Sequence, residues 1–327
     1  MDQTRRTLIV TEKPHQARNI APHWVSHYPN DTLLHFHTPP MGSFKFSLPR
    51  DLPLSSVPII RDPVLQRRPA GELTLPGTTG FGEDFGAMAR YADHIVCATD
   101  YDPAGCRNFL DLMDHYEVPT PLSKVTWLGL LAEDPVTVKA GIARDWRADH
   151  PDFIATAMIG RARQYFDNLY VLNALPVFGR TLALAGIDPI GDAGFLSKYT
   201  LQMLLMLTKI PEPLTGGDLI GMMSKNPLAL KRSPLGSPTS RHEIFYWLAN
   251  TGCIEISEQD PIKVRAKYVL SERGHRLVRL IHKDCFDPHL CSRLASWGET
   301  WPESKPAVDQ YIRRFFGKQK RFLQTKT

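Results

Sequence analysis

Residues 95–105 read IVCATDYDPAG, and this stretch decides the expected fold. Its first four residues are apolar and two of them are β-branched, which is typical of a buried parallel strand. Asp100 and Asp102 follow where that strand stops, and a helical pattern begins after them. Open α/β sheets bind their ligands at the carboxyl ends of their strands. The stretch therefore predicts a strand that delivers two carboxylates to a site at the edge of a parallel sheet.

A second stretch, residues 8–14 (LIVTEKP), repeats this arrangement near the start of the chain and places Glu12 and Lys13 after its strand. Mg²⁺ is held in proteins by one or two carboxylates together with waters and substrate phosphates. We therefore expect Glu12, Asp100 and Asp102 to form a site for Mg²⁺ or Mn²⁺ that serves phosphate chemistry. An acidic pair after a strand also occurs as a helix N-cap or a turn, and this structural alternative stays open.

The two motifs resemble the Toprim signature, in which a Glu follows the first strand and D-x-D-x-x-G follows a later one. This signature is shared by topoisomerases, bacterial primases and several nucleases, and the surroundings are most similar to type IA DNA topoisomerases. The resemblance implies catalytic roles for Glu12 in proton transfer and for Asp100 and Asp102 in binding Mg²⁺. The family usually has D-x-D-R-E-G, whereas Ala104 stands here in place of the third acid. The number of metal ions and their affinity therefore stay open.

The composition is that of a folded protein. The chain has 327 residues, of which 43% are hydrophobic, enough for one large core or two moderate ones. No run reaches the roughly eighteen apolar residues of a membrane span, and the first strand leaves no room for a signal peptide. Five cysteines without C-x-x-C spacing argue against a disulfide framework and a structural zinc site. We expect a cytoplasmic protein without a membrane partner.

We expect two domains: residues 1–148 form an α/β Toprim-like domain with a mostly parallel sheet, and residues 149–327 form a mainly helical domain. Between 153 and 175 the apolar residues recur at helical spacing. A similar segment leads out of the Toprim domain in type IA enzymes, where arginines approach DNA phosphates. Because Arg161 and Arg163 point in different directions on a helix, we expect one to meet a phosphate and the other an acidic side chain. A solvated helix face is the alternative.

Residues 242–283 predict the order helix, strand, turn, strand and basic helix. This order is typical of a winged-helix-like element, and the fourth domain of type IA topoisomerases has a similar one. Ser240 is expected to cap the first helix. A winged helix binds DNA or protein; for DNA, the expected contacts are Lys231, Arg232 and Arg241, with Lys263, Arg265 and Lys267 in the wing.

Basic charge is concentrated at the end of the chain. Residues 225–327 carry 19 Lys and Arg against 10 Asp and Glu, whereas residues 1–224 carry 20 against 24. After Asp309, basic residues that include Arg313 and Arg314 are interspersed with aromatic ones. This pattern predicts a basic C-terminal tail that binds single-stranded DNA through counterion release and base stacking, with Lys13 as a further DNA contact. A solubilising tail is the alternative.

Strand passage requires a nucleophilic tyrosine, which the family presents closely followed by Arg and Thr. None of the ten tyrosines has that context. Tyr199 precedes Thr200 but has no arginine partner, while Tyr165 and Tyr170 fit aromatic packing in a helix. The large gate region that carries the tyrosine in the family is missing as well. The resemblance therefore implies a shortened relative without autonomous strand passage.

Three functions stay open. The first is Mg²⁺-dependent, topoisomerase-like DNA binding in DNA processing, with a possible partner protein in a mobile-element or replication complex. The second is a Toprim metal-dependent nuclease that uses Glu12, Asp100 and Asp102. The third is a non-catalytic DNA- or protein-binding relic of the fold. Cleavage products, a covalent protein–DNA adduct, or retention of DNA without either would separate them.

Overall fold

The computed structural model describes residues 4–38, 44–46, 52–63, 65–67, 85–188, 196–227, 234–258 and 266–326. The chain divides into two compact units. Unit 1 contains Met1–Ser47, Pro63–Gln164 and Gly298–Pro302, and unit 2 contains Leu48–Asp62, Tyr165–Trp297 and Glu303–Thr327. After the sheet, the chain passes from unit 1 to unit 2 between Gln164 and Tyr165, inside the long helix α5 (Pro151–Ala185). This helix begins just after the boundary expected at residue 148.

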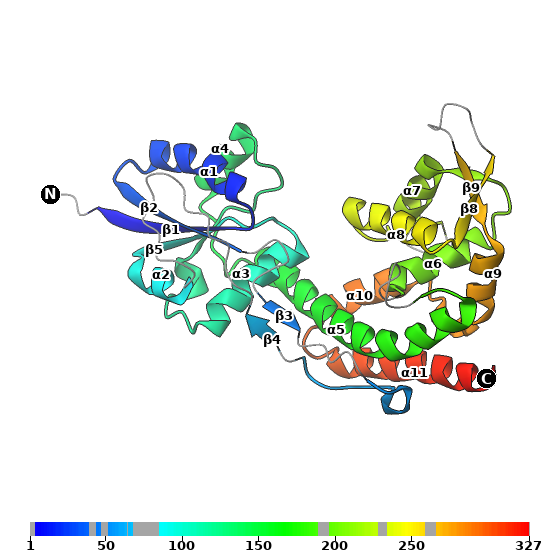
Figure 1. The fold of residues 1–327 in the computed structure, drawn as a ribbon. Coiled ribbons are helices and arrows are strands. Elements are labelled where there is room, and N and C mark those ends of the chain that lie inside the picture. The colour runs from blue at the N-terminus through cyan, green and yellow to red at the C-terminus, as the bar shows by residue number, and fades with distance from the viewer. Residues whose placement is uncertain are drawn as a thin grey trace. The chain divides into compact units, whose positions relative to one another are not determined.

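Unit 1 is built on a four-stranded parallel sheet with the strand order β2-β1-β5-β6 (Figure 1). Its strands are β1 (Arg5–Thr11), β2 (Asp31–His37), β5 (His94–Cys97) and β6 (Thr126–Trp127). The parallel sheet expected from the sequence is confirmed. The chain runs outward from β1 to β2 on one side and from β5 to β6 on the other. The boundary between β1 and β5 is therefore the topological switch point, where open α/β sheets bind ligands.

Helices cover both faces of this sheet (Figure 1) because successive strand residues point to opposite faces. Ile9 and Val96 pack on one face against α1 (Pro14–His27) and α4 (Pro135–Arg144). Leu8 and Val10 point to the other face, which holds α2 (Phe85–Tyr91), α3 (Pro103–His115) and the start of α5. The switch point is thus fixed between two packed layers. Unit 1 also contains an antiparallel pair, β3 (Phe44–Phe46) with β4 (Leu65–Arg67), and a 3₁₀ turn, η2 (Leu122–Lys124).

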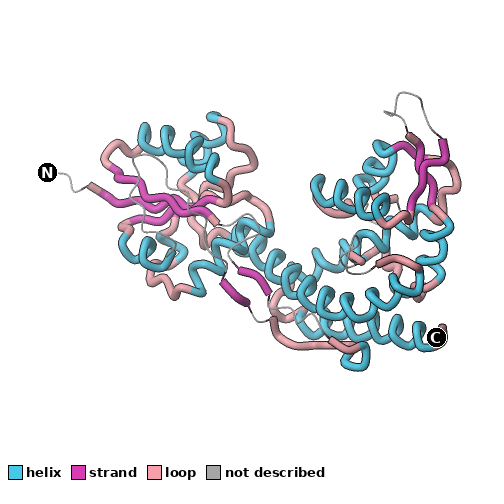
Figure 2. Tube along the Cα trace, in the orientation of Figure 1, coloured by secondary structure: helices cyan, strands magenta, loops and turns pink. Residues whose placement is uncertain are grey.

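Unit 2 is mainly helical, with one small antiparallel sheet (Figure 2). Its helices include α6 (Lys198–Leu207), α7 (Gly216–Lys225), α8 (Pro238–Asn250), α9 (Glu272–Arg279), α10 (Leu290–Glu299) and α11 (Lys305–Gln324). The sheet order is β7 (Leu214–Thr215), β9 (Lys267–Leu270), β8 (Ile254–Glu258), and two 3₁₀ turns are η1 (Leu54–Ser56) and η3 (Lys283–Cys285). None of the described helices combines the length and the apolar character needed to cross a lipid bilayer.

The segment from α8 to α9 has the expected order of helix, strand, strand and helix, with two differences. A third strand, β7, which the sequence analysis did not include, pairs with β9. The expected cap at Ser240 is wrong, because the helix begins earlier and Ser237 is its N-cap. Ser237 accepts a hydrogen bond from the Ser240 backbone N–H at 3.2 Å. The serine that precedes Pro238 fits this role because proline is tolerated at the first helical position.

The C-terminal segment, which the sequence predicted as a basic tail, is the helix α11. Its apolar residues repeat at helical spacing and bury one face. Phe316 packs 5.3 Å from Tyr170 and Phe315 packs 6.3 Å from Phe178, measured between ring centroids. These two phenylalanines are buried in unit 2 and are not available for base stacking. Basic side chains remain exposed along α11.

One buried polar side chain fixes α11 in unit 2. Gln319 is fully buried; it accepts a hydrogen bond from the His282 N–H at 2.7 Å and donates one to the Leu280 carbonyl at 2.8 Å. Lys320 donates to the carbonyl oxygens of Ser55 and Val57 at 2.9 and 2.7 Å. Part of the positive charge counted in the sequence therefore serves to hold the fold.

Candidate functional site

The two acidic motifs meet at the carboxyl edge of the parallel sheet. Strands β1 and β5 are neighbours, with Val10 opposite Cys97, so the residues that follow them emerge side by side. The backbone N–H of Asp100 donates a hydrogen bond to Glu12 Oε2 at 3.3 Å. Residues 88 positions apart in the sequence are thereby joined at the switch point.

Asp102 has a clear structural role. It is the N-cap of α3, and its Oδ1 accepts hydrogen bonds from the N–H groups of Ala104 and Gly105, both at 2.8 Å. Gly105 is required by close packing, because a Cβ at this position would lie 2.2 Å from the Asp100 carbonyl oxygen. The N-cap alternative weighed for the acidic pair therefore holds at Asp102. Capping does not remove its negative charge from the site.

Asp100 is held by two side chains from the turn between β1 and α1. Lys13 Nζ lies 2.8 Å from Asp100 Oδ2, and the Gln16 amide donates to Asp100 Oδ1. Gln16 also accepts hydrogen bonds from the backbone N–H groups of Glu12 and Lys13, both at 2.9 Å. Gln16 is buried, whereas 48% of the Lys13 side chain is exposed. One glutamine thus fixes the turn and orients the neighbouring strand's aspartate.

Glu12 is the carboxyl group whose protonation is most perturbed. Burial raises its pKa to about 7, and the nearby negative charges of Asp100 and Asp102 act in the same direction. The Asn108 amide opposes this shift because it donates a hydrogen bond to Glu12 Oε1 at 3.0 Å. Asn108 is itself oriented by Arg107, which donates to its Oδ1 at 2.7 Å. A carboxyl group with a pKa near neutrality can accept or donate a proton under physiological conditions.

A hollow of about 420 Å³ opens beside these residues, and we call it the acidic hollow. It is lined by Lys13, His15, Gln16, Asp100, Tyr101, Asp102 and the loop residues 130–133. Glu133 closes one wall of the hollow. Its Oε1 lies 3.3 Å from His15 Nε2, and its Oε2 accepts a hydrogen bond from the Asn19 amide at 3.0 Å. Leu131, on the same loop, is 81% exposed. The hollow therefore combines two aspartates, a lysine ammonium group and an exposed apolar side chain.

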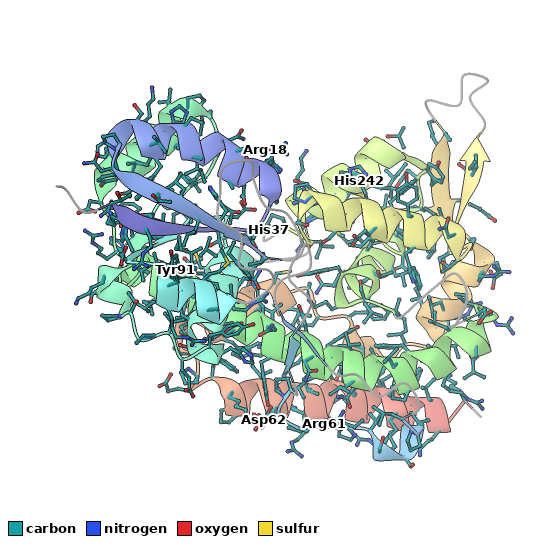
Figure 3. All side chains as sticks on the ribbon, turned by 60° about the vertical axis from the view of Figure 1, so that its left-hand side comes forward. Arg18, His37, Arg61, Asp62, Tyr91 and His242 are labelled. Atoms are coloured by element: carbon teal, nitrogen blue, oxygen red, sulfur yellow. The ribbon has the colours of Figure 1, made fainter. Side chains whose placement is uncertain are left out.

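His37 ends β2 and pairs in register with Thr11 at the end of β1 (Figure 3). Burial lowers the pKa of its imidazole. Arg18 lies on α1 in the same view, in the helix that begins beside the acidic edge (Figure 3). The end of β2 thus adds an imidazole to the carboxyl edge of the sheet.

The three carboxylates do not form a ready metal site. Mg²⁺ prefers oxygen ligands of this kind, so the donor chemistry is suitable. However, within the part of the chain that the structure describes, no three His, Cys, Asp or Glu side chains are grouped so that they could hold a metal ion. Lys13 and Gln16 donate hydrogen bonds to the carboxylate of Asp100, and the α3 backbone donates to that of Asp102. A metal ion at this edge would require Asp100 to exchange a partner.

The predicted DNA contacts are distributed over both units. Arg161 forms ion pairs with Asp111 at 2.9 Å and with Asp114, while Arg163 is exposed on the same helix. One of the two arginines thus meets acidic side chains, as expected, and the phosphate contact of the other stays a prediction. Arg161 is thus paired within the fold, and the DNA contact predicted for it stays a prediction.

In unit 2, Arg241 on α8 donates to the carbonyl oxygens of Leu235 and Gly236 at 3.3 and 3.2 Å. This guanidinium group closes the turn before its own helix, which limits it as a DNA contact. Arg313 and Arg314 are exposed on α11. The expected contacts Lys231 and Arg232, and the wing residues Lys263 and Arg265, lie outside the described residues.

The tyrosines of α5 serve packing, as expected. Tyr165 donates a hydrogen bond to Asp309 at 2.6 Å, and Tyr170 donates one to the Leu196 carbonyl at 3.1 Å. Burial raises the pKa of both phenols well above its usual value. Neither hydroxyl is poised to act as a nucleophile.

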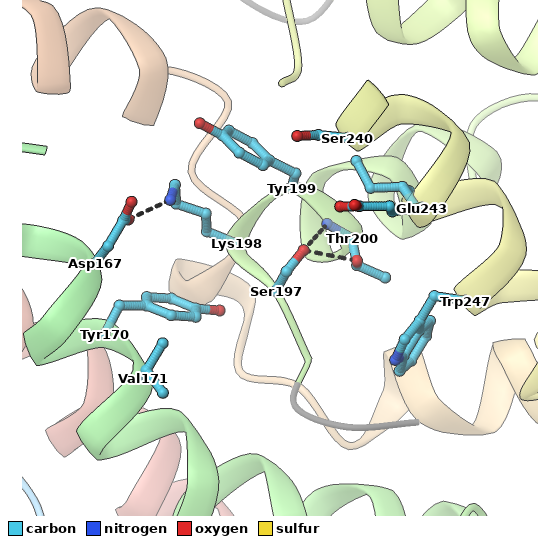
Figure 4. Close-up of a pocket in the computed structure, with 11 residues that line it drawn as sticks. Asp167, Tyr170, Val171, Ser197, Lys198, Tyr199, Thr200, Ser240, Glu243 and Trp247 are labelled. Carbon is cyan, nitrogen blue, oxygen red and sulfur yellow. Dashed lines mark hydrogen bonds and ion pairs between the residues drawn. The ribbon is translucent and has the colours of Figure 1, made fainter. Parts of the chain in front are cut away.

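Tyr199 lines a second hollow, of about 360 Å³, within unit 2 (Figure 4). Beside it, Lys198 forms an ion pair with Asp167 and its ammonium nitrogen lies 4.6 Å from the Tyr199 ring centroid. Ser197 caps α6 by accepting a hydrogen bond from the Thr200 N–H at 3.0 Å. The cation beside Tyr199 is thus already paired with an acid.

Three residues of the acidic site were missed by sequence reasoning: Gln16, Asn108 and Glu133. Only Gln16 leaves a local signal, because a Gln at the third position of a helix commonly bonds back to the residue before that helix. Asn108 and Glu133 reach the site through the packing of α3 and of the loop after β6.

Comparison with known proteins adds no assignment. The chain matches no protein-family model, and no curated protein matches its sequence. The function is therefore inferred from the geometry of the acidic site and from the sequence motifs that contribute its residues.

Proposed function

We propose that this chain is a DNA-binding, type IA topoisomerase-like protein that acts in DNA processing without passing strands on its own. In this proposal unit 1 is a Toprim-like domain, and the segment from α8 to α9 is a winged-helix-like element. The acidic hollow receives a phosphate of single-stranded DNA, with Lys13 as the cationic contact. The protein works in the cytoplasm, alone or with a partner protein in a DNA-processing complex.

The observation that carries the proposal is the junction of Glu12 and Asp100 at the topological switch point. Two sequence motifs that resemble one family's signature come together there by a hydrogen bond of 3.3 Å. The junction lies beside a hollow that contains an ammonium group. Acidic residues with an adjacent lysine at the carboxyl edge of a parallel sheet suit chemistry at a phosphate group.

Further support comes from basic side chains that are exposed to solvent. Arg163 on α5 is exposed, as are Arg276 and Arg279 on α9 and Arg313 and Arg314 on α11. Exposed cations of this kind bind polyanions by releasing condensed counterions, so binding is expected to weaken steeply as the salt concentration rises. The same faces also suit an acidic protein, and competition between the two separates these partners.

A metal-dependent nuclease is the second candidate, and the pKa of Glu12 favours it. A carboxyl group whose pKa is about 7 is suited to general acid–base catalysis at neutral pH. Mg²⁺ or Mn²⁺ on Asp100 and Asp102 would neutralise phosphate charge. Water activated by Glu12 would then replace the tyrosine as the attacking group.

The test uses purified full-length chain, labelled single-stranded DNA and either Mg²⁺ or Mn²⁺. Retention at low salt without products supports the DNA-binding proposal, and fragments support the nuclease. Fragments must disappear in Glu12→Gln and Asp100→Asn and persist in Glu299→Gln, which removes an exposed carboxylate of unit 1. A covalent protein–DNA adduct trapped by denaturant would show that a tyrosine cleaves the strand. That result would contradict the expectation that no tyrosine of this chain does so. Failure to retain DNA at low salt would refute both candidates.

A further inference from the structure

Asp100 is the only predicted metal ligand that is held by an ion pair among the residues that the structure describes. We propose that this ion pair makes metal binding conditional: an anion must take the Lys13 ammonium group before Asp100 can hold a divalent ion. The inference rests on the proposed function for the identity of the anion, a phosphate of single-stranded nucleic acid. The exchange itself is a property of Lys13, Gln16 and Asp100.

The distances explain the conflict between Lys13 and a metal ion. Lys13 Nζ lies 2.8 Å from Asp100 Oδ2. A Mg²⁺ ion coordinates carboxylate oxygen at about 2.1 Å, so an ion on the same oxygen would lie within about 5 Å of the ammonium nitrogen. Two cations at that separation repel each other strongly in a partly enclosed site. The ammonium group and the metal ion therefore compete for Asp100 Oδ2.

The two partners of Asp100 differ in their freedom to leave. Gln16 is 2% exposed, and its carbonyl oxygen is fixed by two backbone N–H groups. Lys13 is 48% exposed, lines the acidic hollow and carries its charge on a flexible chain. An anion in the hollow can therefore draw Lys13 away while Gln16 keeps Asp100 Oδ1 in place. After the exchange, Oδ2 would be free to hold a metal ion, and Gln16 would keep the carboxylate oriented.

This exchange couples two ligands. Each ligand removes an obstacle to the other, so metal and nucleic acid bind with positive cooperativity, and the coupling factor is the same in both directions. Coupling between sites is commonly about 5- to 150-fold in affinity. We expect at least about fivefold here, the lower end of that range, because the ion pair is partly exposed.

The direct test measures Mn²⁺ binding to the full-length chain without any nucleic acid, by electron paramagnetic resonance of free Mn²⁺. Lys13→Gln removes the competing charge and leaves a polar side chain that is one atom shorter, so it is expected to bind Mn²⁺ at least about fivefold more tightly than the wild type. Lys139→Gln is the matched control, because Lys139 is an exposed lysine on α4 of the same unit. Asp100→Asn is expected to remove the gain when combined with Lys13→Gln.

The reciprocal test measures the anisotropy of a labelled oligothymidylate at constant ionic strength. Mn²⁺ is expected to tighten its binding to the wild type by at least about fivefold and to have no such effect on Lys13→Gln. Far-ultraviolet circular dichroism checks that each variant keeps the native helix content.

The outcomes separate this inference from the proposed function. Tighter Mn²⁺ binding by Lys13→Gln, together with no oligothymidylate binding by any form, supports the exchange and refutes the proposed function. Equal Mn²⁺ affinity in the wild type and Lys13→Gln, or no Mn²⁺ binding by a folded Lys13→Gln, overturns the exchange whether or not nucleic acid binds.

Discussion

Replacing Glu12 by glutamine is expected to change how the stability of unit 1 depends on pH. The pKa of Glu12 is about 7 in the folded chain against an ordinary value of 4.5, chiefly because the carboxyl group is buried. The two values differ by about 2.5, and each whole step in pKa corresponds to about 1.36 kcal/mol, so ionised Glu12 destabilises the fold by roughly 3 kcal/mol. Glutamine has nearly the same shape and carries no charge.

The direction of this pH dependence follows from proton binding to Glu12. Between pH 4.5 and about 7 the folded chain holds a proton on Glu12 that the unfolded chain has released. Wild-type stability is therefore fully present below pH 4.5 and falls as the pH rises towards 7. The free energy of unfolding of Glu12→Gln, measured relative to the wild type, should rise by roughly 3 kcal/mol over this interval and stay level above it. The Asn108 hydrogen bond to Oε1 survives the substitution and adds no pH dependence.

The assay is urea unfolding at a series of pH values in the presence of a chelator, followed by amide hydrogen exchange in β1 and β5 so that unit 1 is observed separately. Glu299→Gln is the control, because it removes an exposed carboxylate of the same unit. A stability difference that stays constant from pH 4 to pH 8 would show that Glu12 is not a buried, charge-coupled acid. That result would also remove the main support for acid–base chemistry at the site.

Five further substitutions test other parts of the structure. Arg161→Gln removes one of the two cationic partners of the largely buried Asp111, whose other partner is Arg107 at 3.6 Å, and should lower the free energy of unfolding by about 1.5–3 kcal/mol in urea melts. Arg163→Gln should leave stability unchanged and reduce the salt slope of DNA binding by about one in titrations. Gln319→Leu leaves an N–H and a carbonyl group unsatisfied beside α11 and should cost about 2–4 kcal/mol by the same melts; no loss would mean that the amide is dispensable. Gly105→Ala forces a Cβ against the Asp100 carbonyl and should cost about 1–3 kcal/mol and perturb the acidic site, as seen in hydrogen exchange. Gly221→Ala, in an open position of α7, should stabilise the chain by up to about 1 kcal/mol, and equal effects of the two glycine substitutions would contradict the packing argument.

Much of the parallel sheet was predictable because strands buried on both faces leave continuous apolar runs. Residues 8–10 and 95–97 are such runs, and the structure places them in adjacent strands. The polar residues after each run had to emerge at one edge, since all four strands are parallel. The approach of Glu12 to Asp100 was therefore expected before any contact was known.

The C-terminal segment shows how the same reasoning fails. Arg313 and Arg314 directly precede two phenylalanines, and the local pattern of basic and aromatic residues favoured an exposed nucleic-acid-binding tail. A helix places these neighbours on different faces, and α11 buries Phe315 and Phe316 while the arginines stay exposed. Composition reports which side chains are present, whereas the buried face depends on the apolar surface that α5 offers to α11.

The sequence by itself determined the parallel sheet and the edge at which the acids gather, because both follow from local hydrophobic patterns and strand direction. Only the tertiary structure decided the state of those acids. Lys13 and Gln16 hold Asp100, the α3 backbone holds Asp102, and Asn108 meets Glu12. These partners depend on burial and on distances between elements, and burial sets both the pKa of Glu12 and the competition at Asp100. No local pattern in the chain encodes either quantity.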